Sequence, residues 1–202
     1  MIKYIKAAIY RLDLHKYLAK RRLRVISELV ENKLDQGEKL KVLEVGCHNG
    51  RDFIHFLKGK ENIQITGLDI EDYGIEQENF EYCGSDAEAI PFPDKYFDIV
   101  VSIGVLEHIT PIEKLCRVIS EIDRVSNQFV MIVPSVNTLI EPHTASVLWQ
   151  LRSVRHKESY PGLNFFSDEA WLSFSGFKRA KTKRFWLIPF ILGNLCIYSK
   201  TE

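Results

Sequence analysis

The fold is decided by one stretch of the chain, which reads Val42-Leu43-Glu44-Val45-Gly46-Cys47-His48-Asn49-Gly50. Residues 40–45 form a short apolar run, which is typical of a buried strand. Gly46 lets the chain turn sharply and lets a ligand approach the backbone. Gly50 lets the helix expected over residues 51–58 start close to the strand, with its free N–H groups facing the cleft. The stretch predicts the strand–turn–helix unit of a Rossmann-like domain, although many such domains share it.

Outward from this unit, strand-like and helix-like stretches alternate, which is the pattern of a parallel sheet covered by helices. Further strands are expected over residues 63–68, 80–83, 97–102, 128–133, 177–185 and 195–199. Helices are expected over residues 1–32 and 164–176, with Ser167 as a cap. Another helix is expected to open with Thr110 as its N-cap, Pro111 in the first helical position and Glu113 completing a capping box.

The composition is that of an ordinary globular protein with one α/β domain. The chain has 202 residues, of which 46% are hydrophobic and 27% charged, and its formal net charge is zero. No bulk charge marks it as a general nucleic-acid binder, although residues 1–24 and 178–184 are locally basic. The four cysteines are widely spaced, which suggests neither disulfides nor a metal site. We see no signal peptide, and we expect a reduced, cytoplasmic protein.

Acidic residues come at the ends of three successive strands, as Glu44, Asp69 and Asp86. In a parallel sheet these ends meet at one edge, where ligands bind. Asp69, about twenty residues after the glycine turn, is in the position from which a carboxylate can accept both ribose hydroxyls of a nucleoside. Asp86 could accept a hydrogen bond from an adenine amino group. The sequence therefore predicts a site for a nucleoside-containing cofactor.

Beyond these single residues, the chain resembles the class I S-adenosylmethionine-dependent methyltransferases. The resemblance is carried by the motifs at residues 44–50, 67–70, 85–102 and 105–109, and it is extended by residues 133–134 and 175–177. It covers residues 40–199. It implies an α/β fold with a Rossmann-like, seven-stranded, mostly parallel sheet, helices on both faces and an antiparallel last strand.

The resemblance implies S-adenosylmethionine as cofactor, with S-adenosylhomocysteine as product. The residues assigned to it are Glu44, Gly46, Cys47, His48, Gly50, Asp69, Ile70, Asp86, Ala87 and Ile103. By the same resemblance, the two glycines cradle the methionine portion, Asp69 binds the ribose, and Asp86 reads the adenine edge. His48 departs from the pattern, because the family usually has glycine there. A side chain at this position could narrow the loop or touch the cofactor's carboxylate.

The reaction can be inferred more readily than the acceptor, because methyl transfer from a sulfonium mainly requires alignment and exclusion of water. A base is useful for a hydroxyl or a protonated amine. His108, near the expected methyl position, is the candidate base, and His143 lies in the segment that usually builds the acceptor pocket. The alternative, which ranks first for both, is that His108 caps the loop or bonds to the backbone and that His143 is an ordinary loop residue. Tyr160, Phe165 and Phe166 either line an apolar acceptor pocket or belong to the core.

We therefore expect methyl transfer to a small-molecule or lipid-like acceptor. One alternative is a non-catalytic S-adenosylmethionine-binding module, which the departure at His48 would signal. An RNA methyltransferase ranks lower, since no Asn-Pro-Pro-Tyr-type motif is present. A nicotinamide dehydrogenase would share the glycine turn and Asp69 but gives no role to Asp86 or to residues 91–94.

Residues 1–36 are expected to form an N-terminal helical lid or extension, and residues 37–202 the methyltransferase domain. The basic N-terminal helix and the apolar run at residues 185–192 suit the surface of an anionic bilayer, so peripheral membrane contact is a further expectation. Alternatively, the helix covers the cofactor and the run joins two core strands. The oligomeric state is left open.

Overall fold

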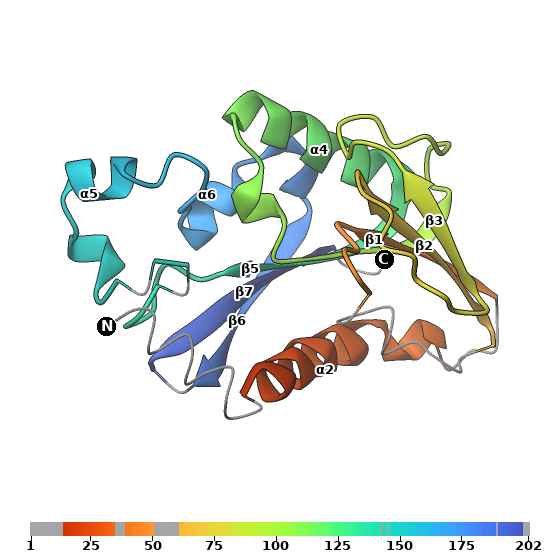
Figure 1. The fold of residues 1–202 in the computed structure, drawn as a ribbon, viewed down its shortest axis with the longest axis horizontal. Helices are drawn as coiled ribbons and strands as arrows, with labels where there is room; N and C mark the ends of the chain where they lie inside the picture. The colour runs from red at the N-terminus through yellow and green to blue at the C-terminus, as the bar shows by residue number, and fades with distance from the viewer. Residues whose placement is uncertain are drawn as a thin grey trace.

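A twisted sheet runs through the middle of the molecule between layers of helices (Figure 1). The computed structural model describes residues 14–34, 39–50, 61–141, 143–144, 146–188 and 190–199. Within these residues, seven strands pair in the order β3-β2-β1-β4-β5-β7-β6. They are β1 (Leu40–Val45), β2 (Ile63–Asp69), β3 (Phe80–Gly84), β4 (Phe97–Ile103), β5 (Ser126–Pro134), β6 (Ala180–Ile188) and β7 (Leu192–Ser199). Only β7 runs antiparallel to its neighbours, which confirms the predicted sheet.

Both faces of the sheet are buried by helices, because the central strands are apolar on both sides. In β4, Val100 and Val101 are fully buried on opposite faces. Val101 belongs to the core cluster that includes Ile26 of α2 (Leu14–Leu34), whereas Val100 belongs to the cluster that includes Val118 of α4 (Ile112–Val125). Figure 1 shows α2 and α4 on opposite sides of the sheet. This arrangement leaves the carboxyl ends of the parallel strands open to ligands.

The N-terminal segment is described from Leu14 onward, and there it is helical. Val25 and Ile26 of α2 pack in the same core cluster as residues of β1, β2, β4 and β5. Residues 1–13, and the helix predicted over residues 51–58, lie outside the described residues. The division into a lid at residues 1–36 and a domain at residues 37–202 therefore stays a prediction. None of the helices in the described part of the chain is long and apolar enough to span a bilayer.

The start of α4 differs from the prediction by one residue. Pro111 is the N-cap, with extended backbone, because its carbonyl accepts the bond from Leu115 N that begins the helix. Thr110 therefore lies outside the helix, joined to Pro111 by a cis peptide bond. No side chain caps α4, so the predicted capping box with Glu113 is wrong.

The helix predicted over residues 164–176 is much shorter. Ser167 caps it as expected, accepting from Ala170 N, but α6 spans only Asp168–Leu172, and η3 (Ser175–Phe177) follows. Asn164 lies outside this helix, where its backbone N–H donates to the carbonyl of Glu107 and its side-chain amide donates to the carbonyls of Leu106 and Ile109. Because Phe177 belongs to η3, the strand predicted at residues 177–185 begins later, at Ala180, and is β6. The remaining short helices are η1 (Leu106–His108), η2 (Trp149–Leu151) and α5 (Val154–Glu158).

Candidate functional site

A cavity of about 590 Å³ lies where β1, β2 and β4 end, at the edge of the sheet predicted for the ligand. Ten of the residues predicted for the site line it: Glu44, Gly46, Cys47, His48, Asp69, Ile70, Asp86, Ala87, Ile103 and His108. Gly50 is not among the lining residues. Its N–H donates to the carbonyl of Cys47 at 2.9 Å, so it shapes the turn. The fold therefore brings together residues that are up to 64 positions apart in the sequence.

The turn after β1 uses left-handed backbone at three of its five residues. Gly46 has φ +74° and Gly50 has φ +67°, as expected for glycines that shape a turn. His48 has φ +44°, in the region that favours glycine, which accounts for glycine being usual at this position. The His48 ring packs against Tyr73 at 4.3 Å between ring centroids, outside the turn.

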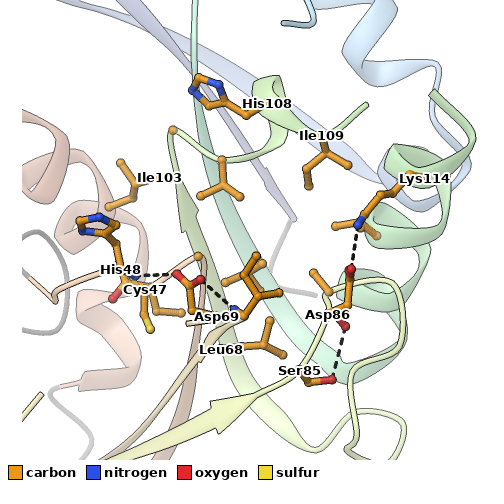
Figure 2. A pocket seen from close by; sticks show the side chains of 18 of the residues that line it. Cys47, His48, Leu68, Asp69, Ser85, Asp86, Ile103, His108, Ile109 and Lys114 are labelled. Atoms are coloured by element: carbon orange, nitrogen blue, oxygen red, sulfur yellow. Dashed lines mark hydrogen bonds and ion pairs between the residues drawn. The ribbon is translucent and has the colours of Figure 1, made fainter. Parts of the chain in front are cut away.

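Asp69 fastens this turn to the end of β2. Its Oδ2 accepts from His48 N at 2.9 Å and its Oδ1 accepts from Ile70 N at 2.8 Å (Figure 2). Each carboxylate oxygen has two acceptor sites, so Asp69 can still accept from a ligand hydroxyl. Beside it, the side chain of Ile70 lines the cavity and is 75% exposed. An apolar side chain left so exposed at a cavity is suited to cover an apolar part of a ligand.

Asp86 is paired with a lysine that the sequence analysis missed. Lys114, in the first turn of α4, donates from Nζ to Asp86 Oδ2 at 2.7 Å (Figure 2). Glu88 N donates to Asp86 Oδ1 at 3.0 Å. The hydrogen bond from Lys114 holds the pKa of Asp86 below its usual value, and the pKa of Lys114 is raised in turn. The site thus has a cation next to the carboxylate expected to read the adenine edge. No motif could have indicated this, because the pairing depends on how α4 packs.

Cys47 faces the cavity as a neutral thiol. Burial raises the pKa of Cys47 to about 12, and the nearby carboxylates of Glu44 and Asp69 add to the shift. The thiolate, which is the nucleophilic form, is therefore scarce at neutral pH. Cys47 acts here as a small apolar wall of the cavity.

His108 lines the opposite end of the cavity. Figure 2 shows His108 well away from Ser85 and Asp86. The ring of His108 meets that of His143 edge to face, with centroids 4.9 Å apart. Burial lowers the pKa of His108, and the neighbouring His143 lowers it further, while Glu141 opposes the shift. The neutral imidazole is thus favoured, as a base or a ligand requires, but the catalytic role of His108 stays a prediction.

Glu107 is a second residue that the sequence analysis missed. It is 3% exposed, and neither of its carboxylate oxygens accepts a hydrogen bond from any described residue. Burial raises the pKa of Glu107 to about 7. Nε2 of His143 lies 3.8 Å from Oε1 of Glu107. Its position directly before His108 was the one sequence feature that could have indicated a role for Glu107. His143, which lies close to it in space, is far away in the sequence.

The aromatic residues considered for an acceptor pocket lie elsewhere. Tyr160 and Phe165 pack around Trp149, and Phe166 packs against Trp171 in the core. None of the three lines the cavity described above. Of the two roles considered for Phe166, in an acceptor pocket or in the core, the structure therefore fits the core.

Comparison with known proteins agrees with this geometry. A family model described as a methyltransferase domain matches residues 43–128, the span that holds the glycine turn, Asp69, Asp86 and His108. Solved S-adenosylmethionine-dependent methyltransferases share the fold. The chain is therefore similar, over residues 43–128, to proteins with a methyltransferase domain, and it has the fold of solved S-adenosylmethionine-dependent methyltransferases.

Relatives of this chain include methyltransferases named for small-molecule acceptors. The 27-O-demethylrifamycin SV methyltransferase of Amycolatopsis mediterranei is 28% identical over 112 residues, which are 47% of this chain and 40% of the relative. The fatty-acid O-methyltransferase of Mycolicibacterium smegmatis is 36% identical over 76 residues, which are 33% of this chain and 27% of the relative. The aligned part of the chain thus spans less than half the length of these relatives.

One similar solved structure is the 1,6-didemethyltoxoflavin-N1-methyltransferase of Burkholderia thailandensis, with 1,6-didemethyltoxoflavin and S-adenosylhomocysteine bound. The TM-score is 0.60 at 16% identity, and the match covers 98% of this chain and 90% of that one. At this identity the match shows that the fold is shared.

Proposed function

We propose that this protein transfers a methyl group from S-adenosylmethionine to a small-molecule acceptor. The observation that carries the proposal is the cavity at the strand ends, which gathers the turn at Gly46, Asp69 and Asp86. Its volume of about 590 Å³ falls within the range of small-molecule and cofactor sites. Asp69 keeps acceptor sites for a ribose, and neutral Cys47 adds no negative charge beside it. The residues present therefore fit this cofactor.

The cofactor supplies an electrophilic methyl carbon on a sulfonium whose leaving group is a neutral thioether. The chain's own residues hold the reactants and exclude water. Asp69 fixes the turn and offers its free lone pairs to ribose hydroxyls. Asp86, oriented by Lys114, faces the adenine end, and the apolar side chains of Ile70 and Ile103 cover the cavity. Alignment of this kind can supply much of the rate enhancement of a displacement reaction.

We further propose an apolar or lipid-like acceptor that is reached at a membrane surface. Exposed apolar side chains gather on the segment that holds η2 and the start of α5, where Leu151 is 80% exposed and Leu148 and Val154 are also exposed, and on the turn between β6 and β7, where Phe190 is 78% exposed. Residues 139–140 connect the two, because Leu148 N donates to Leu139 O and Ile140 N donates to Ile191 O. Exposed Arg152 and Arg155 lie in the same segment. Apolar side chains among basic ones suit an anionic bilayer, where each basic residue adds about 1 kcal/mol.

The membrane proposal is tested by co-sedimentation with phosphatidylserine-containing liposomes at low and high salt. We expect binding at low salt that weakens in the double variant Leu151→Ser/Phe190→Ser. Ile112→Ser, which changes an exposed apolar residue on α4, is the matched control. Absence of co-sedimentation at low salt would contradict this part of the proposal.

The four cysteines are free thiols, which supports the expected reducing, cytoplasmic location.

The reaction is tested with methyl-labelled S-adenosylmethionine and a metabolite and lipid extract, followed by identification of the labelled product. We expect a labelled apolar product that is missing with the Asp69→Ala variant. A protein that binds S-adenosylhomocysteine but labels nothing across extracts and purified acceptors would instead be a non-catalytic binding module.

A further inference from the structure

We propose that Glu107, His108 and His143 form a binding site for a divalent transition-metal ion at the end of the cavity away from Asp86. One ligand atom from each of the three residues lies within 4.8 Å of the others. His108 also lines the cavity, so an ion held there would face the acceptor. The use of this ion in catalysis rests on the proposed methyl transfer, whereas its binding does not.

The spacing of the three ligand atoms is close to that of a metal centre. Zinc–nitrogen bonds of about 2.0–2.1 Å put tetrahedral ligand atoms roughly 3.4 Å apart. Nε2 of His143 and Oε1 of Glu107 are already 3.8 Å apart. The remaining contraction requires side-chain rotation, and His108, one of the three ligands, is exposed.

The buried carboxylate of Glu107 calls for a cationic partner. It is 3% exposed, and its two oxygens accept no hydrogen bond from the described part of the chain. Buried charges in proteins are normally paired or coordinate metals, because an isolated one is strongly destabilising. Arg22 of α2 interacts with Glu107 through its charge, but no hydrogen bond joins them. A cation bound between Glu107 and the two histidines would satisfy the carboxylate directly.

His143 is oriented by a second carboxylate, as metal-binding histidines usually are. Its Nδ1 lies 3.1 Å from Oε1 of the buried Glu141. The same carboxylate is fixed by Thr144 N, which donates to Oε2 at 2.7 Å. With the Nδ1 proton donated to Glu141, Nε2, which lies 3.8 Å from Oε1 of Glu107, carries the lone pair that a metal ion requires. The cluster thus has both the ligands and the support that hold a metal ion.

The donor groups of the cluster, two imidazoles and one carboxylate, indicate which ions it binds and what such an ion does in the reaction. This donor set is found in catalytic zinc sites and in two-histidine, one-carboxylate iron sites, and it leaves coordination positions open. Magnesium and calcium, which prefer oxygen ligands, fit less well. An open position facing the cavity suits a hydroxyl oxygen of the acceptor, whose pKa the ion lowers. The acceptor's O–H bond would then break, with its proton passing to solvent. The oxygen's electron pair would form the new bond to the methyl carbon while the methyl–sulfur bond breaks and its electron pair stays on sulfur.

The test is a titration of the chelator-treated full-length protein with Zn²⁺, followed by competition with a chromophoric chelator and by Co²⁺ absorption spectroscopy. We expect one tight site per chain and the visible bands of nitrogen- and oxygen-ligated cobalt. Glu107→Gln and His143→Ala should each weaken Zn²⁺ binding by more than about 100-fold, and Glu141→Gln by about 10–100-fold. His156→Ala, which changes a neighbouring histidine outside the cluster, should keep the affinity of the unmodified protein.

Circular dichroism establishes that each variant is folded, and His108→Ala, at an exposed position, serves where a buried variant fails to fold. The proposal is overturned if the unmodified protein binds no Zn²⁺, or if folded Glu107, His108 and His143 variants bind it equally well. Zn²⁺ is titrated without cofactor. A protein that binds the ion at this cluster but transfers no methyl group would therefore refute the proposed function alone.

Discussion

At the residue scale, the cavity depends on Asp69, whose two carboxylate oxygens hold the turn at His48 and the backbone at Ile70. Asp69→Ala removes both bonds and the predicted ribose partner. We expect S-adenosylhomocysteine to bind about 1.5–3 kcal/mol more weakly, or roughly 10- to 150-fold, by calorimetry. Asp72→Ala removes a nearby exposed carboxylate that does not line the cavity and should leave the affinity unchanged. Equal affinities in folded proteins would remove Asp69 from the site.

His48 illustrates how a departure from the family pattern can be tolerated. The left-handed backbone of His48, with φ +44°, destabilises the folded state by about 1 kcal/mol relative to glycine. The packing of its ring on Tyr73 stabilises the folded state by roughly the same amount. We therefore expect His48→Gly to leave the free energy of unfolding nearly unchanged. His48→Ala, which keeps the strain and loses the packing, should be destabilising in the same denaturant titration. Loss of turnover in His48→Gly with intact cofactor affinity would instead reveal a catalytic role.

The cysteines differ in environment, and their reactivity should follow. Burial raises the pKa of both Cys47 and Cys196 to about 12, so few of these thiols are ionised at neutral pH. Cys116 is exposed on α4. Peptide mass spectrometry during a timed reaction with iodoacetamide should show Cys116 modified first and Cys47 protected. Rapid alkylation of Cys47 would contradict the closed environment described for it.

At the element scale, the turn between β1 and the next segment relies on Gly46. A Cβ at Gly46 would overlap Cγ2 of Val105, and φ is +74°. Gly46→Ala should therefore lower the free energy of unfolding by about 2–4 kcal/mol, combining backbone strain with overpacking, and weaken cofactor binding. Gly74→Ala is the matched control, because φ is +62° there but the space is open. Gly74→Ala should lower the free energy of unfolding by only about 1–2 kcal/mol. Similar losses for the two variants would contradict the packing argument.

The segment after β3, which carries Asp86, is held to α4 by Arg124. The guanidinium donates to the carbonyls of Ile90 and Phe92 and to Glu121. Arg124→Ala should lower the free energy of unfolding by about 2–3 kcal/mol, since these carbonyls lose a charged donor. Cofactor binding should weaken as well. Arg117→Ala, which removes an exposed pair with Glu88 on the same helix, should leave the denaturation midpoint almost unchanged. A midpoint shift of equal size in both variants would refute the role given to Arg124.

At the scale of the whole molecule, the sequence predicts the sheet well because strand positions follow from local apolar runs. The run at residues 97–102 and the acids at residues 69 and 86 are local features, and parallel topology brings their ends to one edge. Pairings that depend on packing between distant segments could not be predicted this way. Lys114 meets Asp86 across 28 residues, and Glu107 meets His143 across 36.

The same limit explains the errors at helix ends. Thr110 has the sequence signature of a cap, but the carbonyl that accepts the first helical bond belongs to Pro111. Asn164 has no apparent role in the sequence, but its side chain joins the loop at residues 106–109 to the segment before α6. Both outcomes depend on contacts between elements. Local signatures therefore indicate which elements exist more reliably than where they end.

Calorimetric titration of the purified protein with S-adenosylhomocysteine and, in parallel, with NAD⁺ tests whether the cavity at the strand ends binds S-adenosylmethionine. We expect saturable binding of one S-adenosylhomocysteine per chain and no binding of NAD⁺ at the same concentrations. Folded protein that binds NAD⁺, or that gives no binding heat with S-adenosylhomocysteine at any temperature tried, would contradict it.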